Sequence, residues 1–165
     1  MDNLAAPCQH SGLANWRSPI DQQQYDPQAM RKEYDSFGSA MKETPALNGS
    51  FFLSEGYSLA GVKAVPSEMT AYANRDGKFL ASPVMRSSPP DTEAAQAAAK
   101  LRNELRSIFY EASGQTKLHA YVNYAFGNES KQNWYGYEQW RQDKLLAMKK
   151  KHDHQRKFSL YAPTA

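Results

Sequence analysis

The chain has 165 residues, of which 41% are hydrophobic and 22% charged, and its formal net charge is +3. This length predicts one domain with a modest core, and so small a charge argues against nucleic-acid binding, which needs a wider basic surface. The single cysteine, Cys8, excludes an internal disulfide and a cysteine-based zinc or iron–sulfur site. No segment reads as a signal peptide or membrane span, so we expect a cytoplasmic protein without membrane partners.

The first half of the chain predicts an arm, a helix and a strand. Residues 1–25 hold prolines, a glycine and a glutamine run without periodicity, so we expect an irregular N-terminal arm that could cross to a second subunit, before a domain over residues 26–165. Asp26-Pro27 is typical of a helix start, and apolar residues at helical spacing continue the helix to Pro45. A short aromatic strand is expected over residues 50–55.

A hairpin and a long helix follow. Residues 70–74 and 78–86 flank Asp76-Gly77, a sequence that favours a tight turn between two strands. After a turn over residues 87–90, Asp91 is a candidate cap for a helix over residues 92–113 that Gly114 ends. Its apolar residues form one stripe: Ala94, Ala98, Leu101, Leu105, Ile108, Phe109 and Ala112.

The last third predicts a strand and a helix. Residues 117–126 alternate as a strand does, with Leu118, Ala120, Val122, Tyr124 and Phe126 on one face. A helix over residues 137–152 is expected to bury Tyr137, Trp140, Leu145 and Met148, and its terminal lysines complement the helix dipole. The predicted fold class is α+β, an antiparallel β-sheet covered on one face by helices.

Two motifs in this last third carry a resemblance. Tyr121-Val122-Asn123-Tyr124 is followed by Trp134-Tyr135-Gly136, and residues 70–75 read Thr-Ala-Tyr-Ala-Asn-Arg. At this spacing the chain resembles the C-terminal substrate region of berberine-bridge-type FAD-linked oxidoreductases, from about residue 50 onward. The family's Tyr-Asp-Pro element is replaced by His152-Asp153-His154.

The resemblance implies a substrate domain without its FAD-binding domain. In the family that domain comes first, and the segment before Asp26 is too short to supply it. Cys8 and His10 match no flavin-attachment motif. We therefore expect this chain to hold no cofactor, and we expect no metal site at His152, Asp153 and His154 because their spacing suits none.

The resemblance also implies site residues. By position Tyr124 matches a tyrosine that acts as a base on a substrate phenol, and Asn123 matches an asparagine near the flavin edge. Strand alternation gives another interpretation, in which Tyr124 is a core residue while Tyr121, Asn123 and His119 form a polar cluster. Our candidate catalytic residues are Tyr124, Tyr121, Asn123 and His119, and our candidate substrate-binding residues are Glu55, Tyr72, Arg75, Trp134 and Tyr135.

Three hypotheses of function follow. The first is a cofactor-free enzyme of secondary metabolism that isomerises or cyclises an aromatic or polyketide-like substrate by acid/base chemistry. The second is a non-catalytic binding or accessory subunit that complements a separate FAD-binding chain. The third is a product without activity. A homodimer is expected because part of a larger domain leaves sheet edges and an apolar face uncovered.

Overall fold

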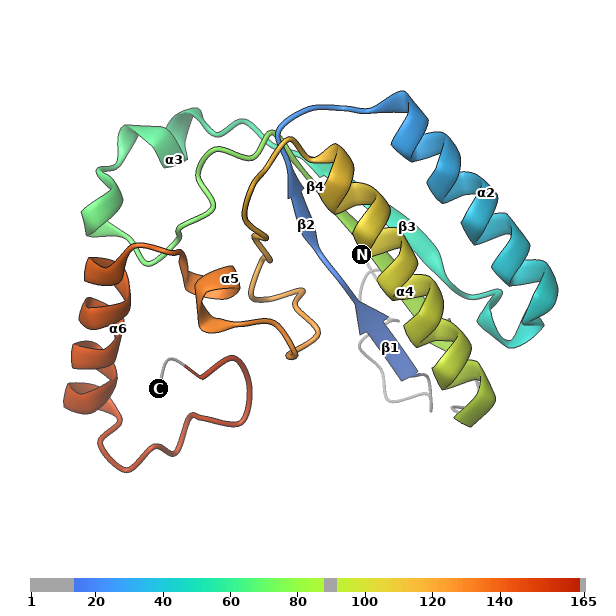
Figure 1. Cartoon of the computed structure of the whole chain (residues 1–165). Helices are drawn as coiled ribbons and strands as arrows, with labels where there is room; N and C mark the ends of the chain where they lie inside the picture. Colours follow the sequence, from blue (N-terminus) through green and yellow to red (C-terminus); the bar gives the residue numbers. More distant parts are fainter. Residues whose placement is uncertain (1–13, 88–91, 164–165) are drawn as a thin grey trace, which may run out of the picture.

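The computed structural model describes residues 14–87 and 92–163, and its centre is one long strand, β4 (Phe79–Ser87). Strand β3 (Phe51–Gly56) pairs with one edge of β4, and β1 (Ala14–Arg17) and β2 (Ile20–Gln22) pair in succession with the other, all antiparallel (Figure 1). Helices cover one face of this sheet, so the predicted α+β class is confirmed.

The expected irregular arm is wrong for residues 14–22, which form β1 and β2 and pair with β4 of the same chain. The register puts Arg17 opposite Val84 and Ile20 opposite Ala81, so Ser18 and Pro19 interrupt an otherwise continuous edge strand. Proline cannot donate to a ladder, which explains the interruption. The rest of the arm, residues 1–13, lies outside the described residues.

Helices α2 (Pro27–Glu43) and α4 (Thr92–Ala112) confirm two sequence predictions. The Asp26 carboxylate caps α2 by accepting from the backbone N–H groups of Gln28 and Ala29. The stripe of α4 packs on the sheet, and its Phe109 ring stacks on Phe52 of β3 with centroids 4.9 Å apart. Gly114 ends the helix region with a φ of +72°. The turn predicted over residues 87–90 lies mostly outside the described residues.

Two expected strands are absent from the described part of the chain. Residues 117–126 form turns instead, in which the Tyr124 N–H donates to the Tyr121 carbonyl and the Ala125 N–H to the Val122 carbonyl. Residues 70–74 are also irregular, so β4 has no hairpin partner there. Gly77 lacks the positive φ of a tight hairpin turn, and a Cβ on it would come within 3.2 Å of the Asp21 Cβ. Gly77 therefore allows close packing against Asp21 and does not serve a tight turn.

Small elements build the rest of the molecule, to the left of β2 in Figure 1. They are α3 (Ala60–Ala64), α5 (Lys131–Tyr135), α6 (Gln139–His152), and a short 3₁₀ turn at Ser67–Met69. Another 3₁₀ turn, Pro45–Leu47, follows α2 and packs Leu47 into the core beside Met85 and Leu101. None of the helices in the described ranges is long and apolar enough to cross a membrane.

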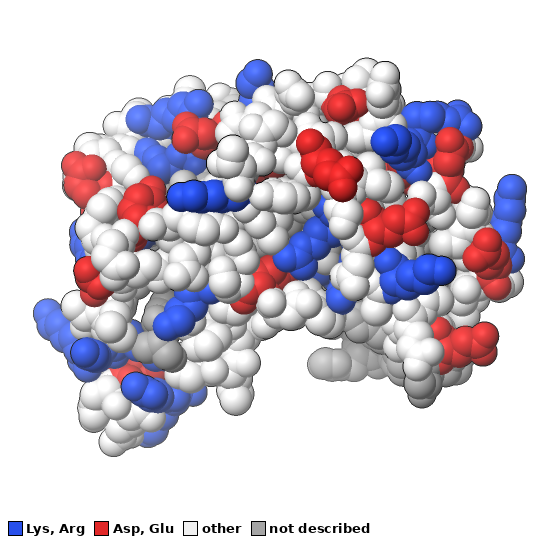
Figure 2. All heavy atoms as spheres, in the orientation of Figure 1, with Lys and Arg blue, Asp and Glu red and all other residues white. Residues whose placement is uncertain are grey.

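The expected buried face of the last helix is wrong. Helix α6 begins at Gln139, leaves Trp140 and Met148 exposed at 41% and 52%, and buries Arg141 instead. The Arg141 guanidinium donates to the Thr70 carbonyl and the Ser67 hydroxyl, each at 2.7 Å. A cation can be buried at this position because backbone and hydroxyl oxygens satisfy it. The lysines of the last turn gather at the lower left of Figure 2, while charges of both signs mix elsewhere on this face.

Candidate functional site

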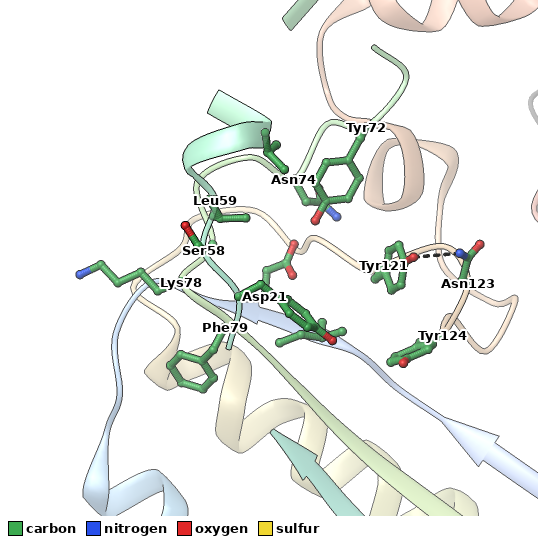
Figure 3. Close-up of a pocket in the computed structure, with 14 residues that line it drawn as sticks. Asp21, Ser58, Leu59, Tyr72, Asn74, Lys78, Phe79, Tyr121, Asn123 and Tyr124 are labelled. Atoms are coloured by element: carbon green, nitrogen blue, oxygen red, sulfur yellow. Dashed lines mark hydrogen bonds between the residues drawn. The ribbon is translucent and has the colours of Figure 1, made fainter. Parts of the chain in front are cut away.

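A cavity of about 400 Å³ lies where β2 and β4 meet the loops of residues 57–62, 72–78 and 121–124 (Figure 3). It brings together four of the nine predicted site residues, Tyr72, Tyr121, Asn123 and Tyr124. The 121–124 turn places both tyrosines of the Tyr-x-Asn-Tyr motif on the same wall. Strand alternation had also put residues 121 and 123 on the face opposite Tyr124, so that separation is wrong.

Aromatic contacts fix the tyrosine wall. The rings of Tyr121 and Tyr124 meet edge to face with centroids 5.2 Å apart, and those of Tyr72 and Tyr121 at 6.3 Å. The Asn123 side-chain amide donates to the Tyr121 hydroxyl at 2.8 Å (Figure 3). Asn123 therefore orients one phenol of the cavity.

Glu55 connects to the cavity through tyrosine hydroxyls. The Tyr124 hydroxyl donates to Glu55 Oε1 at 3.4 Å, while Glu55 Oε2 is buried without a hydrogen-bond partner. Burial, followed by the neighbouring Glu55 charge, raises the pKa of Tyr124. The hydrogen bond to Glu55 also raises the pKa of Tyr57 to about 12. Both phenols hold their protons at neutral pH, so Tyr124 suits a proton donor, or a relay to Glu55, better than a free phenolate base.

Asp21 is a cavity residue that the sequence analysis missed. It lies on β2 opposite Leu80, is only 7% exposed, and its Oδ2 atom has no hydrogen-bond partner. Burial raises the pKa of Asp21 from 3.8 to about 7. The one pattern in the sequence that could have indicated it is the apolar Ile20 followed by the polar Asp21, an alternation typical of a short strand. We had assigned this stretch to an irregular arm.

His119 lies behind the cavity wall. Its Nδ1 is 2.9 Å from the Oδ1 of Asn74, a buried residue that lines the cavity and was also missed. Burial lowers the pKa of His119, so the ring is neutral at pH 7. Because the amide oxygen only accepts, a neutral His119 donates from Nδ1. His119 reaches the cavity through Asn74 and does not line it.

Of the five predicted substrate-binding residues, Tyr72 lines the cavity, Glu55 lies behind its wall, and Arg75, Trp134 and Tyr135 lie elsewhere. Arg75 donates to the backbone carbonyls of Val62 and Val65 and so holds the end of α3. The Trp134 indole donates to Glu129 at 3.2 Å, and the Tyr135 hydroxyl to the Ala162 carbonyl at 2.5 Å. The two aromatic residues belong to a small separate core around Ala120.

The motif that contains these aromatics has a structural reason. Gly136 ends α5 with a φ of +95°, and a Cβ there would lie 2.7 Å from the Ala73 Cβ and 2.5 Å from a Glu138 oxygen. Only glycine fits this approach of α5 to the 70–75 loop. The Trp134-Tyr135-Gly136 motif therefore supports the loops around the cavity. The family signature alone did not show whether these residues contact substrate or support the residues that do.

No metal cluster forms in the described residues, where no three His, Cys, Asp or Glu side chains gather in a geometry that could hold an ion. His152, Asp153 and His154 lie at the end of α6, away from the cavity. The Asp153 carboxylate accepts from the backbone N–H groups of Lys157 and Phe158. Its role is to cap the following turn.

No family model matches the sequence, but individual proteins of known name are similar to it. The chain is 43% identical over 159 residues to the FAD-linked oxidoreductase chyH of Penicillium rubens and 38% identical over 159 residues to chry5 of Gibberella zeae, covering 96% of this chain each time. It spans about a third of both relatives, 32% and 31% of their length.

Among solved structures, the chain is similar to a carbohydrate oxidase from Microdochium nivale, crystallised with a substrate analogue. The TM-score is 0.61 at 19% identity, over 92% of this chain and 32% of that one. This likeness shows the fold. The two sequence relatives show that the chain corresponds to one region of proteins named FAD-linked oxidoreductases, as its resemblance to the berberine-bridge-type family predicted.

Proposed function

We propose that this chain forms the substrate-binding region of an FAD-linked oxidoreductase, with the tyrosine-walled cavity as the site for an aromatic or polyketide-like metabolite. The observation that carries the proposal is the match of 96% of the chain to oxidoreductases of that name. The gathering of the Tyr-x-Asn-Tyr side chains around one cavity supports it. Tyrosine rings offer both stacking surface and hydroxyl groups to such a ligand.

The proposed chemistry of this chain is proton movement. Tyr124 donates to Glu55, so a ligand hydroxyl beside Tyr124 can pass its proton to the phenol oxygen while Tyr124 passes its own to Glu55. In the reverse direction, Tyr124 protonates a ligand oxygen on which negative charge develops. Asn123 holds the adjacent Tyr121 hydroxyl and keeps the wall ordered.

The described residues do not fit the phosphates of FAD. A dinucleotide site uses a glycine-rich turn between a strand and a helix N-terminus. Here the glycines with positive φ are Gly114, Gly127 and Gly136, and none follows a strand. Gly136 precedes α6, but the N-cap residue of that helix is Glu138, whose negative charge would repel a phosphate. The first amides of α2 are already occupied by the Asp26 carboxylate, which would repel a phosphate. The proposal therefore assigns the flavin to residues outside the described part of this chain.

A second function is a cofactor-free isomerase or cyclase that uses the same cavity. The observation that favours it is the hydrogen bond from the Tyr124 hydroxyl to Glu55, because proton transfer along it would need no flavin. The same cavity would then protonate and deprotonate one ligand at two positions, an enolisation or ring closure without net oxidation. This second candidate predicts turnover by colourless protein.

An absorbance spectrum of the purified chain, followed by equilibrium dialysis against FAD, tests the main proposal. We expect no flavin bands and no FAD uptake at about 100 μM, a concentration at which a native site is saturated. Stoichiometric FAD would contradict the assignment of the flavin elsewhere. Conversion of a phenolic substrate by the colourless chain, lost in Tyr124→Phe, would instead establish the second candidate.

The predicted homodimer is part of the proposal. Within the described residues β3 pairs only with β4, so its outer edge is free to meet another chain, and Phe158 and Leu160 are exposed at 81% and 102%. Light scattering at micromolar concentration is expected to give twice the monomer mass. A monomer there would contradict it.

A further inference from the structure

The cavity contains a carboxylate without a counter-ion. Asp21 is more than nine-tenths buried and lines the cavity, and its Oδ2 has no hydrogen-bond partner. Its side chain points toward the space between Tyr72 and Tyr121 (Figure 3). An ionised carboxylate in such a position is unfavourable until a donor or cation reaches it.

A second carboxylate lies on the same face of the sheet. Glu55 of β3 and Asp21 of β2 pair with the same residue of β4, Leu80, from opposite sides, so both side chains project from one face. The Glu55 Oε2 atom is also buried without a partner. Asp21 is thus the acidic residue of the cavity lining itself, and Glu55 lies behind it, reached through the Tyr124 hydroxyl.

The positive groups nearby do not neutralise these two. Among the ion pairs of the described residues, none includes Asp21 or Glu55. Lys78 lines the cavity, but its side chain extends away from Asp21 (Figure 3). The Arg17 guanidinium lies over the Tyr124 ring, 4.7 Å from its centroid. A positive charge for Asp21 must therefore come with a ligand.

The walls suit a cation as well. Tyr57, Tyr72, Tyr121 and Tyr124 line the cavity, and the face of a phenol ring attracts an ammonium group. A carboxylate surrounded by tyrosine rings recognises a protonated amine by charge, hydrogen bond and ring face together. A neutral ligand would use only the rings and hydroxyls, and would leave Asp21 unsatisfied.

We propose that the cavity selects ligands in which an aromatic ring carries a protonated amine, with Asp21 as the counter-ion. This inference rests on the proposed function, because it takes the cavity to be the substrate site. It narrows the substrate class from aromatic metabolites in general to nitrogenous ones. Asp21 acts in it as a specificity residue and takes no part in the Tyr124–Glu55 proton transfer.

Calorimetric titration of the full chain with two probes tests the inference. N-methylbenzylamine is protonated at neutral pH, and benzyl methyl ether has the same shape without the charge. At pH 8 we expect the amine to bind at least about tenfold more tightly, the effect of one modest charge-assisted contact. In Asp21→Asn the two probes should bind equally. In the matched control Asp143→Asn, an exposed position on α6 outside this cavity, the preference should persist.

The pH dependence of probe binding tests the same role of Asp21. Since Asp21 titrates near pH 7, amine affinity should rise about tenfold between about pH 6 and pH 8, and ether affinity should not change. Other charged or titratable groups around Asp21 are Tyr57, Tyr72, Tyr121 and Lys78 in the cavity and Arg75, Asp76 and His119 across a smaller one. The slope must therefore vanish in Asp21→Asn.

The outcomes separate the two proposals. Equal binding of amine and ether by the unchanged chain would overturn the inference and leave the aromatic substrate site standing. An amine preference that persists in Asp21→Asn would overturn the role of Asp21. Failure of both probes to bind at about 10 mM, weaker than any functional small-molecule site, would contradict the inference and the proposed function together.

Discussion

Two regions of the molecule are held together by different interactions, and the cavity lies where they meet. The sheet half, residues 14–56, 79–87 and 92–112, has two clusters of buried apolar side chains. The loop half, residues 57–78 and 113–163, has one small cluster, around Trp134. Its segments are joined by polar side chains that bind backbone groups, such as Arg141, Arg75 and Tyr161.

The difference shows which half can carry specificity. Apolar packing tolerates little change without loss of stability, whereas loops held by hydrogen bonds can vary in sequence around the same frame. The sheet half presents Asp21 to the cavity and Glu55 to the Tyr124 hydroxyl, and the loop half presents all four tyrosines of the cavity lining. Four predictions test this division, from the largest expected effect to the smallest.

Phe109→Ala should lower the free energy of unfolding by about 3–5 kcal/mol, because it empties a site in the sheet half that is 1% exposed. Urea denaturation measures it. Tyr34→Ala on the exposed side of α2 is the control and should change stability by no more than about 0.5 kcal/mol. If Phe109→Ala and Tyr34→Ala lowered the free energy of unfolding equally, the placement of Phe109 in the core would be wrong.

Asp21→Asn should stabilise the chain above pH 7. The pKa of Asp21 is raised from 3.8 to about 7, so the unfolded chain ionises first and folding stability falls between about pH 4 and pH 7. At about 1.4 kcal/mol per pH unit, the substitution recovers up to about 4 kcal/mol at pH 8 and almost none at pH 3. Thermal unfolding at the two pH values measures this, and a destabilised variant at pH 8 would contradict it.

Arg141→Met should cost about 2 kcal/mol, because the Thr70 carbonyl and the Ser67 hydroxyl lose a charged donor. The loss is expected to be local, with faster hydrogen exchange over residues 67–75 and no change in α4. Arg31→Met, which removes an exposed pair with Asp35, is the matched control and should leave the free energy of unfolding unchanged within error. Faster exchange throughout α4 would show that the two halves are not separable.

Asp26→Ala should cost about 1 kcal/mol, the usual value of a lost helix cap. The change should appear as faster hydrogen exchange in the first turn of α2. Asp26→Ser keeps a capping oxygen and should recover most of the loss. If Ser and Ala behaved alike, the cap would contribute nothing.

The same division explains how much of the structure the sequence predicts. Helices α2 and α4 and strand β3 follow from local patterns, such as the Asp26-Pro27 start and the stripe on α4. Strands β1 and β2 do not, because they are short and depend on distant pairing with β4. In the loop half, alternation over residues 117–126 indicated a strand, but turn hydrogen bonds at Tyr121 and Val122 satisfy the backbone instead.

For the site, the family motif was more informative than periodicity. It indicated Tyr121, Asn123 and Tyr124, which the cavity brings together. It could not separate these from Trp134, a frame residue, because a motif does not distinguish contact with substrate from contact with its support. Asp21 was missed because no motif includes it, and Asn74 because the motif over residues 70–75 drew attention to Tyr72 and Arg75. The burial of both depends on long-range packing.

A chimera tests the central claim most directly. In this chimera, the present chain replaces the segment of the Penicillium rubens oxidoreductase with which it aligns. The turnover number of the chimera is measured with and without Tyr124→Phe. The account predicts a flavin-loaded, active chimera in which Tyr124→Phe lowers the rate by a factor of about 100 or more, as loss of an acid–base group does. A flavin-loaded chimera with the same rate in both forms would contradict it.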